Sequence, residues 1–432
     1  MVLFLVALVT GVATVAVVQS RPTQPLPIIY NNGTHDFHPT VIFISLDGVV
    51  NHDLDLSITP HLSRLAKEGQ RAHWMTPSFP PITFPNHWSL VTGLSVEAHG
   101  IIGNYFFDPA RNKSFNYKSP ADSWDADWWG GEPIWITAER QQKTAGVIMW
   151  PGCSSVFYGV QPSLSVAYSD NVSFDDKVDI ALGWLDLPLE DRPQFVGLYV
   201  PEIDQKGHAY GPYASQTLKQ LQMADGTIGR LLKEIDARNL TNIVHIMVVS
   251  DHGMSATDKS RLIYLDDGLT QEELDLIWRT ENFPALAIRP YPHADEEQAV
   301  DTLYRAFKRF QGQLDEPHFE VYKRKDIPDR FRFRNNDRIA PLFVLPDPGW
   351  NFVKRSEFDP EHDDFHPRGT HGYDNLSPES RAIFVARGPT FEPGVLKPFT
   401  NTELYQVMSR VLQLEPAPNH GLLNGKLELD SY

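Results

Sequence analysis

The sequence predicts an α/β protein with a central, mostly parallel sheet flanked by helices. Three continuous apolar runs rich in branched residues support this prediction, because strands buried on both faces of a parallel sheet have this pattern. Helical segments alternate with the runs, as crossover connections require. Each run also ends in an aspartate: TVIFISLDGV at Asp47, FVGLYVPEID at Asp204 and IVHIMVVSDHG at Asp251. Ligands of such sheets bind beyond the carboxyl ends of the strands, where these aspartates are expected.

Two helices are predicted in the first hundred residues. One covers residues 59–69, with Thr59 as its cap and Gly69 as its stop. The other begins at or near Thr83, because two prolines restrict the approach and an apolar stretch follows. Bound anions sit at helix N-termini, so the hydroxyl of Thr83 stands where a phosphate could bind.

The second half of the chain continues the alternation. A long amphipathic helix is predicted over residues 214–239, between the strands that end at Asp204 and at Asp251. Residues 265–355 have mixed patterns and include the run RFRFRNNDR. They are predicted to form a smaller inserted region attached to the core rather than an independent domain.

Composition sets limits on function. The chain has 432 residues, of which 41% are hydrophobic and 22% charged, so it can bury a large core. Its net charge of −17 argues against binding of duplex nucleic acid, which requires clustered lysine and arginine. Cys153 is the single cysteine, so no intrachain disulfide forms and stability must come from the core.

The N-terminus is apolar and carries no charge before Arg21. We expect a signal peptide or a membrane anchor over residues 1–20, with attachment through residues 2–18 in the second case, followed by a polar linker over residues 21–38. A buried helix is disfavoured because the run has no polar face. The chain is therefore expected in the secretory pathway, either extracellular or membrane-anchored. Five sequons suit this location as N-glycan acceptors, at Asn32, Asn112, Asn171, Asn239 and Asn375.

Carboxylates and imidazoles gather at the predicted strand ends. Asp204 and His208 lie four residues apart, and Asp251 and His252 are adjacent. A single Asp-His pair is more often an ordinary ion pair or a helix cap. Two such pairs, joined by Asp47 and by His371 of GTHGYDN, favour a site for zinc or a similar divalent ion. With the hydroxyl of Thr83 they provide seven ligands, enough for two ions.

Two metal ions give a chemical reason for the rigidly held hydroxyl of Thr83. Ions about 3.5 to 4 Å apart can clamp the attacking and leaving oxygens of an in-line displacement at phosphorus. Metal coordination lowers the pKa of a bound hydroxyl, and a helix N-terminus acts in the same direction. Alone, Thr83 is more simply a helix cap; its neighbours make it a candidate nucleophile.

Several motifs in order resemble the nucleotide pyrophosphatase/phosphodiesterase family (type I phosphodiesterases) of the alkaline phosphatase superfamily. They are SLDGV, FPPITFPNHWSLVTGL, EAHGIIGNYFFDP, WWGGEPIWITAE, WPG, DQKGHAYGP, SDHGM and GTHGYDN. The resemblance spans about residues 40–425 and implies an alkaline phosphatase-like fold, with one phosphodiesterase catalytic domain over residues 39–432. The small, nearly cysteine-free unit is most similar to the fungal or microbial branch.

The resemblance implies two divalent metal ions, zinc being favoured. One would be held by Asp47, Thr83, Asp251 and His252, and the other by Asp204, His208 and His371.

It also implies the roles of residues around the phosphate. Asn104 would donate a hydrogen bond to a phosphoryl oxygen, aided by the backbone N–H of Phe84. The nucleotide base would stack between Phe84 and Tyr168. Thr83 would attack phosphorus and form a covalent nucleotidyl-threonine, which water then opens.

These implications favour hydrolysis of nucleotide phosphodiester and pyrophosphate bonds, such as a nucleoside triphosphate to the monophosphate and pyrophosphate. A related hydrolase or transferase of the superfamily, acting on a phospholipid, phosphomonoester or sulfate ester, is the main alternative. A binding protein that keeps its metals for structure is a third. Where family members commonly carry lysine before the nucleophile, this chain has Ile82, which leaves substrate preference open.

Other conspicuous residues receive structural interpretations. Trp128, Trp129 and Trp135 are expected to pack the core or line the pocket rim. His87 is not assigned as a general base, because metal activation makes one unnecessary. The run EHDDFHPRG is interpreted as a solvated loop rather than an extra cation site.

Overall fold

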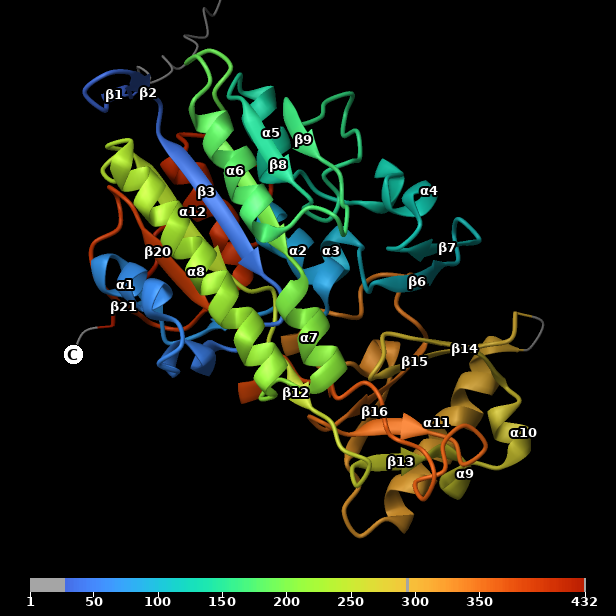
Figure 1. Ribbon diagram of the computed structural model, residues 1–432. Coiled ribbons are helices and arrows are strands. Elements are labelled where there is room, and N and C mark those ends of the chain that lie inside the picture. Colours follow the sequence, from blue (N-terminus) through green and yellow to red (C-terminus); the bar gives the residue numbers. More distant parts are fainter. Residues whose placement is uncertain (1–27, 293–294, 431–432) are drawn as a thin grey trace, which may run out of the picture.

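The computed structural model describes residues 28–292 and 295–430, and Figure 1 shows their arrangement. Eight strands of this described part form the central sheet. In spatial order they are β21 (Gly394–Leu396), β4 (Gln70–Ala72), β20 (Phe384–Arg387), β11 (Val244–Val249), β3 (Thr40–Leu46), β10 (Phe195–Val200), β8 (Ala145–Ile148) and β9 (Leu164–Val166).

β20 is antiparallel to both of its neighbours, and the other neighbouring pairs in the sheet are parallel. The predicted fold class is therefore confirmed. The three strands that the sequence identified, β3, β10 and β11, are adjacent at the centre, and every residue in them is buried. Burial on both faces explains why their sequences are apolar without alternation.

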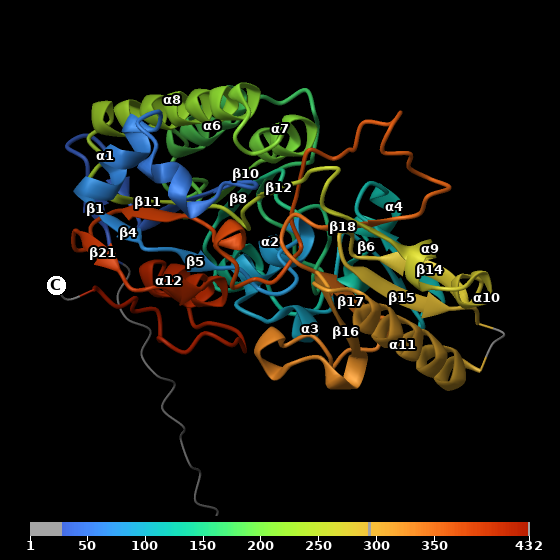
Figure 2. The same cartoon turned by 90° about the horizontal axis from the view of Figure 1, so that it is seen from below.

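Helices cover both faces of this sheet, as Figure 2 shows. One layer contains α1 (Pro60–Glu68), α6 (Phe174–Leu185), α7 (Glu202–Tyr210) and α8 (Ser215–Ala237). The opposite layer contains α2 (Thr83–Thr92), α5 (Ile134–Arg140) and α12 (Leu404–Val411). The helices predicted over residues 59–69 and 214–239 are confirmed, since α1 lies within the first range and α8 within the second.

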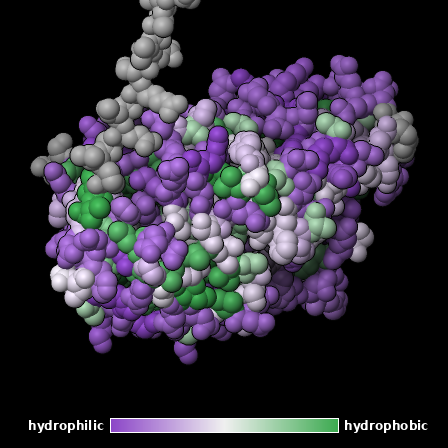
Figure 3. All heavy atoms as spheres, turned by 90° about the horizontal axis from the view of Figure 1, so that it is seen from above, coloured by the Kyte–Doolittle hydropathy of each residue, from purple (hydrophilic) through white to green (hydrophobic). Residues whose placement is uncertain are grey.

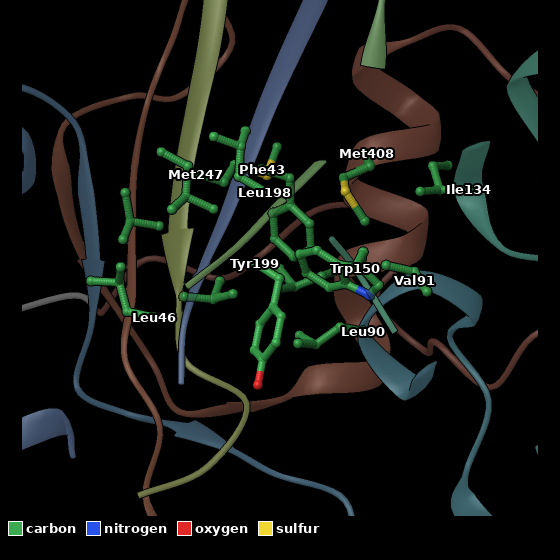
Figure 4. Packing of buried hydrophobic residues seen from close by; sticks show 14 of the residues in the cluster. Phe43, Leu46, Leu90, Val91, Ile134, Trp150, Leu198, Tyr199, Met247 and Met408 are labelled. Carbon is green, nitrogen blue, oxygen red and sulfur yellow. The ribbon is translucent and has the colours of Figure 1, made fainter. Parts of the chain in front are cut away.

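The main core lies on both faces of the sheet, between the strands and each helix layer. Figure 4 shows Phe43, Leu198 and Met247 of the central strands packed towards Trp150 and Met408. The ring of Phe43 stacks on Trp150 with centroids 5.1 Å apart. Trp128, Trp129 and Trp135 are also buried, as the sequence predicts. This close packing fixes the strand ends from which the candidate site is built.

The inserted region is an antiparallel sheet with its own helix. Its strands, in spatial order, are β14 (Ile277–Glu281), β15 (Leu286–Pro290), β17 (Leu342–Pro346) and β16 (Phe319–Lys323), and α11 (Glu296–Gln313) covers it. Leu303, Phe307 and Phe310 of α11 belong to a separate buried cluster with this sheet. Phe343 packs instead against Phe79, with ring centroids 5.8 Å apart, which joins the region to the main core.

Smaller elements complete the described chain. Short paired strands are β1 (Tyr30–Asn31) with β2 (Asp36–Phe37), β5 (Met75–Thr76) with β22 (Phe399–Thr400), β6 (Tyr105–Asp108) with β7 (Lys113–Asn116), β12 (Ser255–Ala256) with β19 (Gly369–Thr370), and β13 (Leu262–Tyr264) with β18 (Asn351–Val353). Short helices are α3 (Val96–His99), α4 (Pro120–Ser123), α9 (Leu265–Gly268) and α10 (Gln271–Leu274).

The predicted leader lies outside the described residues. The described part of the predicted linker forms the β1–β2 hairpin, in which Phe37 is buried under the Arg192 guanidinium at 3.8 Å. Figure 3 views the face that carries this hairpin, where hydrophilic residues predominate and apolar ones form smaller groups. Among the described helices, none is both long and apolar enough to span a bilayer.

The glycan prediction needs one correction. The Asn375 side chain is buried, and its Nδ2 donates a hydrogen bond to the Pro77 carbonyl at 2.9 Å. A glycan on this nitrogen is incompatible with the fold, so Asn375 is not an acceptor in the folded chain. The glycosylation motif is defined by three consecutive residues, whereas the burial of Asn375 results from its contact with a segment far away in the sequence. The other four sequons stay predictions.

The start of α1 is held by a side chain from another helix. Thr59 occupies the N-cap position, as predicted, but its side chain makes no capping hydrogen bond. The buried carboxylate of Asp225 in α8 accepts hydrogen bonds from the N–H groups of His61 at 3.1 Å and Leu62 at 2.8 Å. The first N–H groups of a helix lack partners within it, so Asp225 replaces the usual local cap.

Replacement of Asp225 by alanine should therefore lower the free energy of unfolding by about 1 to 2 kcal/mol, because one buried and one partly buried N–H group lose their acceptor. Urea denaturation followed by circular dichroism would measure the change. Gln222→Ala, at an exposed position of the same helix, is the matched control and should have little effect. Equal stability of the Asp225 variant and the wild type would contradict the capping role.

Candidate metal centre

The predicted ligands converge beyond the carboxyl ends of the central strands. Asp47 directly follows β3, and Asp251 and His252 follow β11 after one residue. Asp204 differs from the prediction: β10 ends at Val200, and Asp204 lies in the first turn of α7. The sequence pattern does not separate the end of the strand from the start of the helix, so the prediction placed Asp204 at the strand end. The first turn of α7 nevertheless brings Asp204 to the same edge of the sheet.

One group of ligand atoms surrounds His252. Asp47, Asp251 and His252 offer atoms that all lie within 4.8 Å of one another. The His252 Nε2 atom is 3.0 Å from Asp251 Oδ2 and 3.5 Å from Asp47 Oδ1. The Thr83 hydroxyl is 3.3 Å from the same nitrogen. The four residues therefore form one cluster, as the sequence predicts.

A second group adjoins the first. His208 Nε2 is 3.3 Å from Asp204 Oδ2, and His371 Nε2 is 3.5 Å from Asp204 Oδ1. The two imidazole Nε2 atoms are 3.2 Å apart. The ring of His252 stacks on His371 with centroids 3.6 Å apart, so His252 stands between the two groups. All seven predicted ligands thus meet in one place.

Backbone carbonyls orient each histidine. The Nδ1 atoms of His208, His252 and His371 lie 2.8 to 2.9 Å from the carbonyl oxygens of Gly369, Gly253 and Pro81 respectively. A carbonyl only accepts, so each Nδ1 is the donor, and each Nε2 faces the cluster as the atom on which a metal ion would replace a proton. This arrangement is typical of metal-binding histidines.

Two of the three carboxylates, those of Asp47 and Asp204, lack sufficient compensation from the protein itself. Burial, with repulsion from Asp251 and Asp204, raises the pKa of Asp47 well above its usual value. Burial also raises the pKa of Asp204. Burial opposes ionisation of Asp251 as well, but His252 and His87 hold its pKa well below the usual value.

Two buried oxygens, Asp47 Oδ1 and Asp204 Oδ1, have no hydrogen-bond partner within the described residues, and Asp251 Oδ2 has only the His252 and His87 imidazoles beside it. Buried charges normally pair or coordinate metals. Divalent cations would satisfy these oxygens, and the mixture of carboxylate and imidazole donors fits zinc.

Thr83 is the first residue of α2, with Ile82 at the N-cap position. The next N–H group, that of Phe84, donates a hydrogen bond to Asn104 Oδ1 at 2.9 Å. The expectation that both Phe84 and Asn104 serve a phosphoryl oxygen stays a prediction. The Phe84 N–H is occupied, and its bond orients Asn104 so that the amide NH₂ is the group left to donate.

A cleft of about 680 Å³ opens beside the cluster. Phe84 and Tyr168, the two predicted base-stacking residues, both line it. The sequence analysis missed several other residues of its wall, namely Tyr117, Lys118, Trp124, Asp170 and Tyr199. Tyr199 could have been suspected, since it is a tyrosine at the end of an otherwise apolar strand.

His87 is buried behind the cluster rather than exposed to the cleft. Its Nδ1 atom donates to the Thr83 carbonyl at 2.8 Å and lies 3.2 Å from Asp251 Oδ2. A side chain so enclosed does not reach an attacking hydroxyl or water, so His87 is not placed to act as a general base. The run EHDDFHPRG is largely exposed, and His362 pairs there with Asp359 at 2.7 Å.

The inserted region reaches the site through one turn. Asn282 has a left-handed backbone with φ of 61°, and its Oδ1 occupies the space of a Cβ at Gly103, only 2.0 Å away. A Cβ at Gly372 would meet the proline ring of the same turn at 3.1 Å. These glycines are the neighbours of Asn104 and His371. The turn is therefore packed against both sides of the site.

Comparisons with known proteins agree with this geometry. A family model for type I phosphodiesterase/nucleotide pyrophosphatase matches residues 41–374. An uncharacterised pyrophosphatase/phosphodiesterase of Schizosaccharomyces pombe is 40% identical over 404 residues, covering 93% of this chain and 82% of that protein. Human ectonucleotide pyrophosphatase/phosphodiesterase family member 1 is 36% identical over 402 residues, covering 91% of this chain. The chain spans only 42% of that human relative's length.

A solved structure is also similar. Murine ectonucleotide pyrophosphatase/phosphodiesterase 5, in an inactive form in complex with AMP, matches with a TM-score of 0.79 and 33% identity. The match covers 89% of this chain and 98% of that chain. The family model, the sequence relatives and the shared fold together establish that this chain belongs to the type I phosphodiesterase/nucleotide pyrophosphatase family.

Proposed function

We propose that the chain is a metal-dependent hydrolase of nucleotide phosphodiester and pyrophosphate bonds, acting through a covalent nucleotidyl-threonine. The observation that carries this proposal is the position of the Thr83 hydroxyl, 3.3 Å from His252 Nε2 and beside buried carboxylates that include oxygens without a hydrogen-bond partner among the described residues. Membership of the family supports the reaction class.

The donor set supports two divalent ions, with zinc favoured. Asp47, Thr83, Asp251 and His252 would hold one, and Asp204, His208 and His371 the other. When bound, such ions supply charge stabilisation and acidify a coordinated hydroxyl or water. The chain itself holds these donor atoms in place at strand ends and helix starts. Backbone carbonyls orient the histidines so that their Nε2 atoms face the cluster.

The reaction follows from the placement of Thr83 and Asn104. The Thr83 hydroxyl loses its proton to solvent and its Oγ1 atom forms a bond to phosphorus, while the bond from phosphorus to the leaving oxygen breaks; this releases pyrophosphate, or an alkoxide that takes a proton from solvent. Water then attacks the same phosphorus, the bond to Thr83 breaks, a proton from the water restores the threonine hydroxyl, and the nucleoside monophosphate leaves. The amide of Asn104, oriented by the Phe84 N–H, donates to the phosphoryl oxygen where negative charge gathers.

The cleft suits a nucleoside. Phe84 and Tyr168 offer aromatic faces on its wall, and stacking of a base is worth roughly 1 to 3 kcal/mol with little dependence on base identity. The murine relative was solved with AMP, which supports a nucleotide in this cleft. Lys118 is the one lysine or arginine among the described residues that line it, so a dianionic phosphomonoester finds less charge compensation than a diester.

We also propose that the enzyme acts outside the cytoplasm. The apolar N-terminus and the sequons other than Asn375 support a secreted or membrane-anchored enzyme with its site outside the cytoplasm. Extracellular nucleotides would then be its substrates.

A substrate panel tests the function directly. Purified protein should convert ATP to AMP and pyrophosphate, and should hydrolyse the p-nitrophenyl ester of thymidine monophosphate much faster than p-nitrophenyl phosphate. Product chromatography and p-nitrophenol absorbance would measure the rates. A preference for p-nitrophenyl phosphate or for a phospholipid headgroup would instead favour the alternative within the superfamily.

Metal content gives a second test. Wild-type protein should contain two zinc ions per chain by elemental analysis, and a chelator should abolish hydrolysis. His371→Ala should lose one ion and about 10²- to 10³-fold in kcat, because charge stabilisation on one side of phosphorus disappears. His366→Ala removes an exposed histidine close in sequence and should leave both quantities unchanged. Full activity in metal-free protein would refute the proposed dependence.

The nucleophile is tested by Thr83→Ala. This variant should lose at least about 10³-fold in kcat, since no other hydroxyl replaces the missing one, while its fold and most of its metal content persist. Thr83→Ser restores a hydroxyl and should recover part of the activity. Mass spectrometry of acid-quenched wild-type reactions should find a nucleotidyl adduct on the peptide containing Thr83. Turnover of the alanine variant at the wild-type rate would exclude the threonine mechanism.

A further inference from the structure

Tyr199 lies where the nucleotide cleft meets the candidate metal cluster. It is the penultimate residue of β10 and pairs with Ser45 of the adjacent parallel strand β3. In Figure 4 its hydroxyl points away from the core cluster, beyond the side chains of the neighbouring strand residues. This direction carries the hydroxyl towards Asp47, the residue that follows β3.

The hydroxyl meets one particular oxygen of Asp47. The Tyr199 O–H donates a hydrogen bond to Asp47 Oδ2 at 2.5 Å. The other oxygen, Oδ1, has no hydrogen-bond partner in the described part of the chain and lies 3.5 Å from His252 Nε2. The two oxygens of one carboxylate therefore have different environments. One is engaged by the tyrosine, and the other faces the cluster with its lone pairs free.

The tyrosine itself is firmly held. Its side chain is buried, and its ring meets the edge of the His87 ring with centroids 4.6 Å apart. His87 is in turn fixed by its hydrogen bond to the Thr83 carbonyl. The Tyr168 ring lies 6.5 Å away on the cleft side. Tyr199 cannot swing away without displacing the wall behind Thr83, so its hydroxyl is a fixed donor.

We propose that Tyr199 is a positioning residue that holds the Asp47 carboxylate with Oδ1 presented to a divalent cation. The inference rests on the proposed metal-dependent function. Outer partners of metal ligands commonly raise affinity or activity about 10- to 100-fold, because they remove the freedom of the ligand to rotate. A purely structural role, satisfying a buried carboxylate for stability, is the competing explanation.

The variant Tyr199→Phe separates the two explanations, since it keeps the ring that lines the cleft and removes only the donor. A positioning role predicts about 10- to 100-fold weaker zinc binding at one of the two positions. At limiting zinc, kcat should fall while KM for the nucleotide changes little, because the ring wall persists. Excess zinc should restore kcat towards the wild-type value. A structural role predicts none of these zinc-dependent effects.

Zinc affinity should be measured by competition with a chromophoric chelator, on metal-free protein whose fold is checked by circular dichroism. Tyr405→Phe is the matched control, because it removes another buried phenol hydroxyl, bonded to Thr137 at 2.8 Å and far from the cluster in α12. The control should bind zinc as the wild type does. Wild-type zinc affinity in Tyr199→Phe, with two ions bound, would overturn this inference alone. A wild-type protein that binds no zinc would instead overturn the proposed function, and the inference with it.

Discussion

The structure depends on the gathering of buried negative charge at one edge of a parallel sheet. Asp47, Asp204 and Asp251 approach one another because the strands that precede them are adjacent and run in the same direction. Three buried carboxylates at this spacing repel one another, and hydrophobic packing holds them there. The fold thus opposes the repulsion with its core and leaves a strong local attraction for cations.

Much of this arrangement can be predicted from sequence, and the reason is physical. A strand buried on both faces must be apolar throughout, so a polar residue in such a run marks its end. Asp47, Asp251 and His252 were found in this way. Parallel topology then places the ends together without further information. The predicted fold class is confirmed, and the seven predicted ligands lie in one cluster.

The features that could not be predicted depend on contacts between segments far apart in the sequence, and the local sequence pattern does not contain this information. Asp204 belongs to a helix rather than a strand end, because α7 begins too soon after β10 for periodicity to separate them. Asp225 replaces Thr59 in capping α1 from another helix. Asn375 matches the glycosylation triplet but is buried. Tyr199 and the bond between Phe84 and Asn104 became visible only from tertiary geometry.

The turn at Asn282 connects the inserted region with the candidate site. It fills the space beside Gly103 and Gly372, which adjoin Asn104 and His371. The inserted antiparallel sheet therefore contacts the candidate site on two sides through this turn, although it supplies none of the seven predicted ligands. The positions of Asn104 and His371 thus depend in part on a turn that contributes no ligand, so replacing the inserted region would change the surroundings of both residues.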